Sequence, residues 1–382
     1  MKLDLLYELQ PKVQPWSKPH PYGQREAEQS VYYEAIDQVK LADTLGFQTV
    51  WFVEHHFREG RSACPSNETV LGGLALCTDN IRLGFGVVLM PPGFQHPARV
   101  AEKVATVDIL SRGRVEWGTG RSTPMEQTAF GVPIDDRSRR MWREAVEFVV
   151  AAWERETISW DSELIHFPER MQTPKPYQDP HPPVWLAAAS ESSAVNAGKY
   201  GLGLLSFALF QPVDAMGKVI STYRDAQASG TPPLTRVRND RAGAYTLVHC
   251  TDDLDEAAEY GLWESVRWWY QHNAEFTLKW ELPNLTPEEQ AAVFPLMKDV
   301  LEGTVDVNRY TDEDMIIVGT VDQCLDKILR YEEAGVDHLL CYMQFGSLPH
   351  DKVMRSIELM GSQVIPELER RGHRMDLRTR AG

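Results

Sequence analysis

Strand-like and helix-like patterns alternate along most of this chain, and that alternation restricts its fold more than any other feature. Short runs of β-branched, aromatic and aliphatic residues, such as residues 48–53, are each followed by a longer stretch with helical periodicity. This order is typical of a parallel sheet that is covered by helices. The strands that we expect cover residues 3–9, 48–53, 81–89, 114–119, 182–189, 202–207, 243–249 and 338–343.

Eight such units predict an α/β fold, a single (β/α)8 TIM barrel with insertions that spans residues 1–382. A doubly wound sheet is the alternative, and it would need about two fewer units. The main helices that we expect cover residues 28–46, 67–77, 96–110, 137–153, 254–269, 320–334 and 352–371.

Three segments interrupt this order. Residues 10–27, rich in proline, tryptophan, glutamine and histidine, predict a loop insertion that is long enough to cover a site. Residues 157–167 alternate like a solvent-facing hairpin. Residues 273–314 mix acidic residues with prolines, and we interpret them as an active-site lid. An inert insertion or an oligomer contact is an equal alternative for this last segment.

Composition limits the class of partner and the compartment. The net charge of −16, from 39 Lys and Arg against 55 Asp and Glu, disfavours nucleic acid or an anionic membrane surface as the main partner. No apolar run approaches the length of a membrane span or of a signal peptide, so we expect a cytoplasmic protein. The cysteines are scattered without a Cys-x-x-Cys spacing, which fits free thiols and argues against a structural zinc: Cys64, Cys77, Cys250, Cys324 and Cys341.

The expected strand at residues 48–53 ends abruptly in Glu54, His55 and His56. In parallel α/β folds, the carboxyl ends of the strands are where ligands bind. Side chains alternate along a strand, so only one of the two histidines can face a common pocket. This disfavours a metal site built on the pair, and we expect no metal. A structural pair that merely caps the strand is the alternative.

Two other strand ends suit an anion. Gly118 and Gly120 allow a close backbone approach, and Arg121 can donate two hydrogen bonds to a phosphate. After the strand expected at residues 182–189, which includes Ala188 as a cofactor-binding candidate, hydroxyls gather at the start of a helix, where the helix dipole favours negative charge. The residues of this second group are Ser190, Glu191, Ser192 and Ser193. Ordinary helix capping or a tight turn is the alternative for either group alone. Both groups on one rim favour a small phosphorylated cofactor.

The sequence of residues 46–57, Gly-Phe-Gln-Thr-Val-Trp-Phe-Val-Glu-His-His-Phe, resembles the catalytic subunit of bacterial luciferase almost residue for residue. Further matches in the same order are His96-Pro97, residues 110–114, Gly118 with Arg121, Ser190, residues 318–320 and Cys324. The chain is therefore similar to the luciferase-like, flavin-dependent monooxygenases over nearly its whole length.

The resemblance implies a barrel that binds reduced FMN at the carboxyl ends of its strands. Oxygen then adds to the flavin C4a carbon, and the resulting (hydro)peroxide oxygenates a substrate. The match assigns Arg121 to the FMN phosphate, together with the hydroxyls of Ser190 and Ser193. It assigns His55 as an acid or base, with Glu54 orienting either His55 or the backbone beside the flavin.

The resemblance also implies a cis peptide bond between Gly86 and Val87, under the flavin. A reactive cysteine of luciferase falls here on Gly120, which removes a thiol and should open space near C4a. The predicted lid matches the mobile loop of luciferase in position only, and its Lys279, Trp280 and Lys298 are weak candidates for gating. Apolar residues near strand ends suggest a largely apolar substrate, with core packing as the alternative: Tyr7, Trp16, Phe85, Phe207 and Met343.

No dinucleotide-binding fingerprint follows the first strand, so a separate flavin reductase is expected to supply FMNH2 to this chain, which then uses O2. A homodimer is expected from the resemblance alone. Two alternatives remain open: a deazaflavin-dependent hydride-transfer enzyme on the same barrel, and a flavin-binding relative without turnover.

Overall fold

The computed structural model describes residues 1–11, 23–58, 60–188, 190–206, 212–281, 286, 288–289 and 296–371. Within these residues, eight parallel strands form a closed barrel in the order β1, β2, β3, β4, β7, β8, β9, β11, and β11 pairs with β1. The predicted TIM barrel is therefore confirmed, and the doubly wound sheet is excluded because the sheet closes. The strands are β1 (Lys2–Tyr7), β2 (Thr49–Phe52), β3 (Arg82–Leu89), β4 (Val115–Gly120), β7 (Val184–Ala188), β8 (Gly203–Ser206), β9 (Ala242–Cys250) and β11 (His338–Tyr342).

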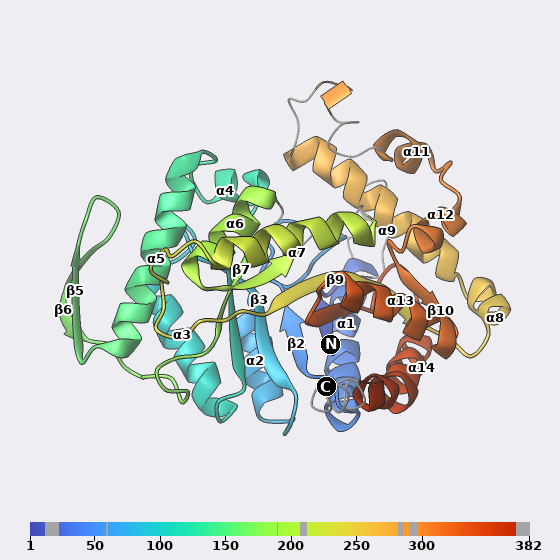
Figure 1. Cartoon of the computed structure of the whole chain (residues 1–382), viewed down its shortest axis with the longest axis horizontal. Coiled ribbons are helices and arrows are strands. Elements are labelled where there is room, and N and C mark those ends of the chain that lie inside the picture. Colours follow the sequence, from blue (N-terminus) through green and yellow to red (C-terminus); the bar gives the residue numbers. More distant parts are fainter. Residues whose placement is uncertain are drawn as a thin grey trace, which may run out of the picture.

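Helices surround the barrel (Figure 1). Several of their N-termini carry capping groups that the sequence supplies locally: the His96 ring accepts from the Ala98 N–H, the Asp135 carboxylate from the Arg137 N–H, and Thr320 forms a capping box with Gln323. The helices are α1 (Gly23–Thr44), α2 (Asn67–Ala75), α3 (Pro97–Leu110), α4 (Pro124–Ala129), α5 (Asp136–Glu154), α6 (Glu191–Tyr200), α7 (Val213–Gln227), α8 (Leu254–Glu259), α9 (Leu262–Phe276), α11 (Met297–Glu302), α12 (Val307–Asp312), α13 (Val321–Glu333) and α14 (His350–Leu359).

Several boundaries differ from the prediction. Helix α1 begins at Gly23, so the last residues of the expected 10–27 loop are helical, and residues 12–22 lie outside the described part. The helix expected at 254–269 is broken at Gly261, whose φ of 90° suits glycine, and its second half runs on to Phe276. Two π-helical turns, η1 (Thr277–Glu281) and η2 (Met360–Val364), continue α9 and α14.

Two short elements were not predicted. Strand β10 (Ile317–Gly319) pairs with the carboxyl end of β9, and α4 lies between β4 and α5. The expected hairpin is present as β5 (Thr157–Asp161) and β6 (His166–Met171), an antiparallel pair that projects from the body of the barrel beside α5 (Figure 1).

Two tryptophans fill the amino-terminal end of the barrel. Trp51 of β2 and Trp185 of β7 meet edge to face, with ring centroids 5.4 Å apart. Glycines make room for both indoles, because a Cβ on Gly84 would lie 2.3 Å from Trp51 and one on Gly203 would lie 2.5 Å from Trp185. The Trp51 indole N–H donates to the buried Asp4 carboxylate at 2.8 Å.

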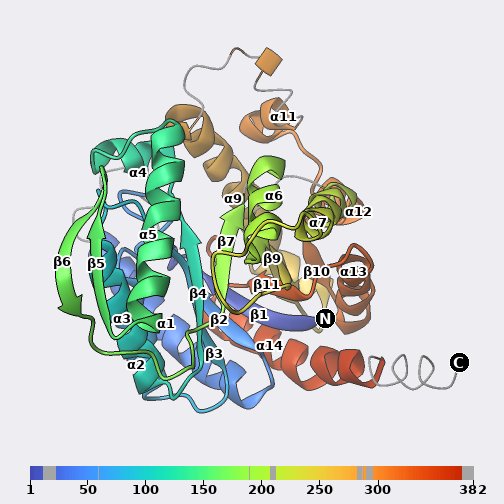
Figure 2. The same ribbon diagram turned by 60° about the vertical axis from the view of Figure 1, so that its left-hand side comes forward.

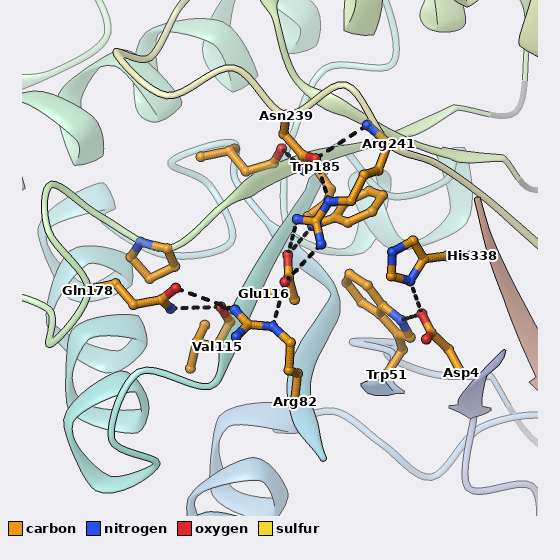
Figure 3. Close-up of polar contacts among 12 residues, drawn as sticks. Asp4, Trp51, Arg82, Val115, Glu116, Gln178, Trp185, Asn239, Arg241 and His338 are labelled. Carbon is orange, nitrogen blue, oxygen red and sulfur yellow. Dashed lines mark hydrogen bonds and ion pairs between the residues drawn. The ribbon is translucent and has the colours of Figure 1, made fainter. Parts of the chain in front are cut away.

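Glu116, at the start of β4, organises the charges at this same end (Figure 3). Its buried carboxylate accepts from Arg82 Nε at 2.6 Å, from the Trp185 indole N–H at 2.6 Å and from Arg241 Nη2 at 2.8 Å. Nearby, Asp4 also accepts from His338 at 3.0 Å. Ionic groups therefore close the end of the barrel that lies away from the carboxyl ends of the strands.

Helices α9 and α11 lie side by side at the opposite, carboxyl-terminal end of the strands (Figures 1 and 2), and α4, which follows β4, contacts the turn η1 that continues α9. Of the helices in the described part, none has both the length and the apolar composition needed to cross a membrane. Among the same residues, no cluster of His, Cys, Asp and Glu could hold a metal ion.

Candidate active site

His55 lies three residues past the end of β2, in the loop between β2 and α2. Its Nδ1 lies 3.1 Å from Oε1 of Glu126, in α4. The His55 side chain is 19% exposed, so a ligand can reach it. Within the described part of the chain, its Nε2 makes no hydrogen bond.

Glu126 is the acceptor around which this part of the site is assembled. Its carboxylate is fully buried and accepts from His55 Nδ1, from the His56 backbone N–H at 2.6 Å, from Arg58 Nε at 3.4 Å and from the Ser122 hydroxyl. A buried carboxylate with this many donors is ionised and holds its neighbours in place.

The pKa shifts fit this assignment. Burial alone would raise the pKa of Glu126, but the charges of His55 and Arg58 and the hydrogen bonds from His55 and Ser122 bring it well below its usual range. Burial and the Arg58 charge lower the pKa of His55, against the opposing effect of Glu126. Since an ionised carboxylate only accepts, a neutral His55 donates through Nδ1–H and keeps a lone pair on Nε2.

Glu54 bonds the backbone of β3 and lies close to His56, whereas the carboxylate bonded to His55 belongs to Glu126. Its Oε2 accepts from the Leu89 backbone N–H at 3.1 Å, at the end of β3, and lies 3.9 Å from Nζ of Lys103. Its Oε1 lies 3.6 Å from His56 Nε2. Of the two roles that the sequence left open, Glu54 therefore holds backbone and His56, while Glu126 orients His55.

The peptide bond between Gly86 and Val87 is cis, as the resemblance implied. Close to this bond, the buried side chain of Asn67, at the start of α2, joins β2 to β3. Its Nδ2 donates to the Phe52 carbonyl at 3.1 Å and to the Val87 carbonyl at 3.3 Å.

The glycines of β4 correct one expectation. A Cβ on Gly118 would lie 2.1 Å from the Phe85 carbonyl oxygen, and one on Gly120 would lie 2.6 Å from Cγ2 of Val87. The absence of side chains at these two glycines lets β3 pack closely against β4. We expected the lack of a thiol at position 120 to leave open space near the flavin, but Val87 fills that space.

Arg121 follows β4 directly and is half-buried. Nη1 donates to the Ser138 hydroxyl at 2.8 Å, and the Arg121 carbonyl accepts from Gln127. Burial and the neighbouring Arg139 charge lower the pKa of Arg121. Arg121 forms no ion pair with a carboxylate of the described residues, so its charge is available to an anion.

The serine group begins α6, after the neighbouring strand β7. The Ser190 hydroxyl lies 3.1 Å from the hydroxyls of both Ser192 and Ser193 and caps the helix by accepting from the Ser193 N–H at 3.4 Å. Glu191 points elsewhere, with Oε1 3.5 Å from the Thr222 hydroxyl. Ala188 is buried at the end of β7. The capping alternative and an anion site are compatible here, because both use the same exposed hydroxyls.

The weaker substrate and lid candidates lie in the core, on the surface or outside the described residues. Tyr7 is buried and its ring stacks on Phe52, with centroids 5.1 Å apart. Phe85 and Met343 are buried in the core, which favours the packing alternative for all three. Lys279 in η1 and Lys298 in α11 are exposed, and Lys298 lies 4.0 Å from Glu302. Trp16, Phe207 and the Trp280 side chain lie outside the described residues, as do residues 282–285, 287 and 290–295 of the 273–314 segment.

Sequence reasoning missed the carboxylates that surround His55. Glu126 belongs to a helix of six residues with no strong periodicity. Glu8 follows β1 and accepts two hydrogen bonds from Arg61, at 2.9 and 3.1 Å. The signal that could have found Glu8 is its position at a strand end, the criterion that identified Glu54.

The resemblance implies FMN, and the rim fits its phosphate. The fit rests on the unpaired charge of Arg121 and on three clustered hydroxyls at the start of α6, which follow two hydrogen-bonded neighbours, β4 and β7. The positive end of the α6 dipole adds to the attraction for a dianion.

Comparisons with known proteins agree with this arrangement. A family described as luciferase-like monooxygenase matches residues 14–338. The chain is 25% identical over 352 residues to the oxygenase component of the flavin-dependent trigonelline monooxygenase of Acinetobacter baylyi, covering 90% of this chain and 91% of that protein. It is 24% identical over 346 residues to an F420-dependent glucose-6-phosphate dehydrogenase of Microbacterium testaceum, covering 88% and 94%.

Among solved structures, monooxygenase RslO1 from Streptomyces bottropensis superposes with a TM-score of 0.74. The two chains are 28% identical in sequence, and the superposition covers 96% of this chain and 100% of that chain.

Proposed function

Because the chain belongs to the luciferase-like monooxygenase family, we propose that it is the oxygenase of a two-component system. It takes reduced FMN from a separate flavin reductase and uses O2 to oxygenate a small, largely apolar organic substrate. The oxygenase-component relative supports the separate reductase. The same proposal includes a homodimer, which is expected from the resemblance, and a location in the cytoplasm, which is expected from the composition of the sequence.

One observation carries the cofactor assignment: adjacent strands β4 and β7 end in an arginine without a carboxylate partner among the described residues and in three clustered serine hydroxyls. Arg121, Ser190 and Ser193 would hold the FMN phosphate. Backbone at Gly86 and Val87 would support the ring system, with the Val87 carbonyl bonded by Asn67 and the Leu89 N–H of the same strand bonded by Glu54. When bound, reduced FMN supplies the electrons that activate O2.

His55 supplies acid and base chemistry. Near neutral pH its Nδ1–H donates to ionised Glu126, so Nε2 can accept a proton or a hydrogen bond from a reacting group. Glu126 stabilises the imidazolium that forms when Nε2 accepts a proton, and His55 can then return that proton. Burial of Glu126 keeps this attraction strong, because water does not screen it.

The experiment that tests the proposal has two parts. The wild-type enzyme, supplied with reduced FMN, an apolar substrate panel and ¹⁸O₂, should place one labelled oxygen atom in a product. Arg121→Ala should weaken FMN binding by about 30- to 150-fold, the loss of one charged hydrogen bond of ~2–3 kcal/mol, with an unchanged circular dichroism spectrum.

Arg137→Ala is the matched control, since Arg137 lies at the start of α5 but pairs with Asp135 at 3.0 Å. FMN affinity that is equal in the two variants would remove Arg121 from the site. Absence of labelled product and of FMN binding in the wild type would refute the proposed function.

A second candidate is hydride transfer with the deazaflavin F420, favoured by the F420-dependent relative. Direct competition between FMN and F420 for the apo-protein distinguishes the two. Tighter binding of F420, with substrate oxidation that does not consume O2, would support this second candidate instead.

A further inference from the structure

Phe276, the last residue of α9, lies against two arginines of the loop that carries His55. Its buried ring faces the Arg58 guanidinium, with 4.8 Å between the guanidinium carbon and the ring centroid, and it lies 6.0 Å from that of Arg61. Both distances are within the range of a cation–π contact. The Phe276 ring thus joins the end of α9 to the loop after β2.

The same two arginines hold the carboxylates beside His55. Arg58 is buried and bonds Glu126 Oε1 at 3.4 Å and the Thr123 hydroxyl at 3.0 Å. Arg61 bonds both oxygens of the buried Glu8. The π-helical turn η1, which continues α9, also contacts α4, the helix that carries Glu126.

Charged groups face His55 from several elements, and they act in opposite directions. Glu126 of α4 and Glu8 after β1 raise the pKa of His55, and Arg58 in its own loop lowers it. Arg61 pairs with Glu8, and the pKa of the buried His272 of α9 is lowered by burial and by the Arg61 charge, against the opposing effect of Glu8. The position of the Arg58 guanidinium therefore sets part of the electrostatic environment of His55.

We infer that Phe276 is a positioning residue: its ring holds Arg58 against Glu126, so the end of α9 fixes the orientation and the proton affinity of His55. Without the ring, the Arg58 guanidinium can turn toward water, where its effect on His55 is screened. The inference rests on the proposed acid and base role of His55, but its test requires no cofactor.

The test is an NMR titration of the His55 imidazole, assigned with His55→Gln, in the wild type and in Phe276→Leu. We expect the pKa of His55 to rise by about half a unit in Phe276→Leu, because a cation that lowers it is no longer held in place. Phe276→Tyr, which keeps the ring face, should restore the wild-type value. Phe276→Met, whose unbranched side chain adapts to an irregular gap in the core, replaces the leucine variant if that one does not fold.

Phe148→Leu is the matched control, because Phe148 is an equally buried ring that contacts His96, Trp160 and Phe167 instead of these arginines. An unchanged pKa in the Phe276 variant, or an equal rise in Phe148→Leu, would overturn the inference. Failure of the wild type to turn over reduced FMN would count against the proposed function and leave this result intact. Where turnover is present, the acidic limb of kcat/KM should move upward with the pKa.

Discussion

His55 depends on side chains that reach it from β1, from its own loop and from α4. A histidine at a strand end is common, and what distinguishes this one is a fully buried carboxylate on one ring nitrogen and a reachable lone pair on the other. The pair resembles the base and orienter arrangement of many hydrolases, which indicates its chemistry without specifying a substrate.

Glu126→Gln tests the orienting role directly. The amide keeps the shape but loses the charge, so we expect kcat/KM to fall by about 10- to 150-fold, the equivalent of the ~1.5–3 kcal/mol of a charged hydrogen bond. The pKa of His55 should fall further, because Glu126 is among the groups that raise it. The pH dependence of kcat/KM and an NMR titration measure both effects.

Glu68→Gln serves as the control, since Glu68 lies near Lys103 at 3.5 Å and not near His55. An unchanged rate in Glu126→Gln, with an unchanged His55 titration, would contradict the assignment.

At this scale, the sequence could predict groups that sit directly at strand ends. His55 and Arg121 were found in this way, and the family resemblance supplied the cis bond at Gly86. Glu126 could not be found, because its importance comes from a tertiary contact between α4 and the β2 loop, across 71 positions of the chain. The misinterpretation at Gly120 has the same origin: the neighbour that fills the space, Val87, is on another strand.

Close packing of β3 on β4 is the feature that most constrains the elements around the site. At Gly118 a side chain would meet backbone, the Phe85 carbonyl oxygen, and backbone cannot move aside as a flexible side chain can. The register of β3 on β4 also shifts between Phe85 and Val88, where the cis bond lies.

Gly118→Ala should therefore lower the free energy of unfolding by about 1–3 kcal/mol or more, as overpacking does in a well-filled core. Gly72→Ala in α2 is the matched control, because nothing lies within 4 Å of its added Cβ. There the change should be neutral or raise stability by up to about 1 kcal/mol, the difference in helix propensity. Urea unfolding measures both, and equal effects at the two sites would contradict the packing argument.

Long, periodic elements were predictable from the sequence and short ones were not. Strands 81–89 and 338–343 and helix 137–153 were found nearly to the residue, because each buries a continuous apolar face. Strand β10 has only three residues, and α4 has six, so neither repeats its pattern often enough to be recognised in the sequence. Gly261 broke a predicted helix through its positive φ, a conformation that the helical pattern around it does not reveal.

Over the whole molecule, buried histidines link stability to pH. Burial lowers the pKa of His249 to about 4, and burial with the Arg61 charge lowers that of His272 to about 3. Each is neutral in the fold and takes up a proton on unfolding below its ordinary pKa of ~6.5. Their contribution is complete above that value and is lost as the pH falls toward the folded-state pKa.

We therefore expect the free energy of unfolding to decline between pH 7 and pH 4 by several kcal/mol, at ~1.4 kcal/mol for each unit of pKa difference. Urea unfolding at intervals across that range measures the slope. His249→Gln, which can still bond the Tyr260 hydroxyl now 2.7 Å from His249 Nε2, should make the slope shallower. A pH-independent stability, or a slope that the variant leaves unchanged, would contradict this account.

The tryptophan and carboxylate layer at the amino-terminal end of the barrel has a practical consequence for laboratory evolution. Asp4 and Glu116 sit at strand starts, whereas His55 and Arg121 follow strand ends, so the two sets of positions do not overlap. A mutant library that randomises the segments after the strands, and leaves the strand starts unaltered, can sample new substrate preferences while the scaffold that tolerates them is preserved.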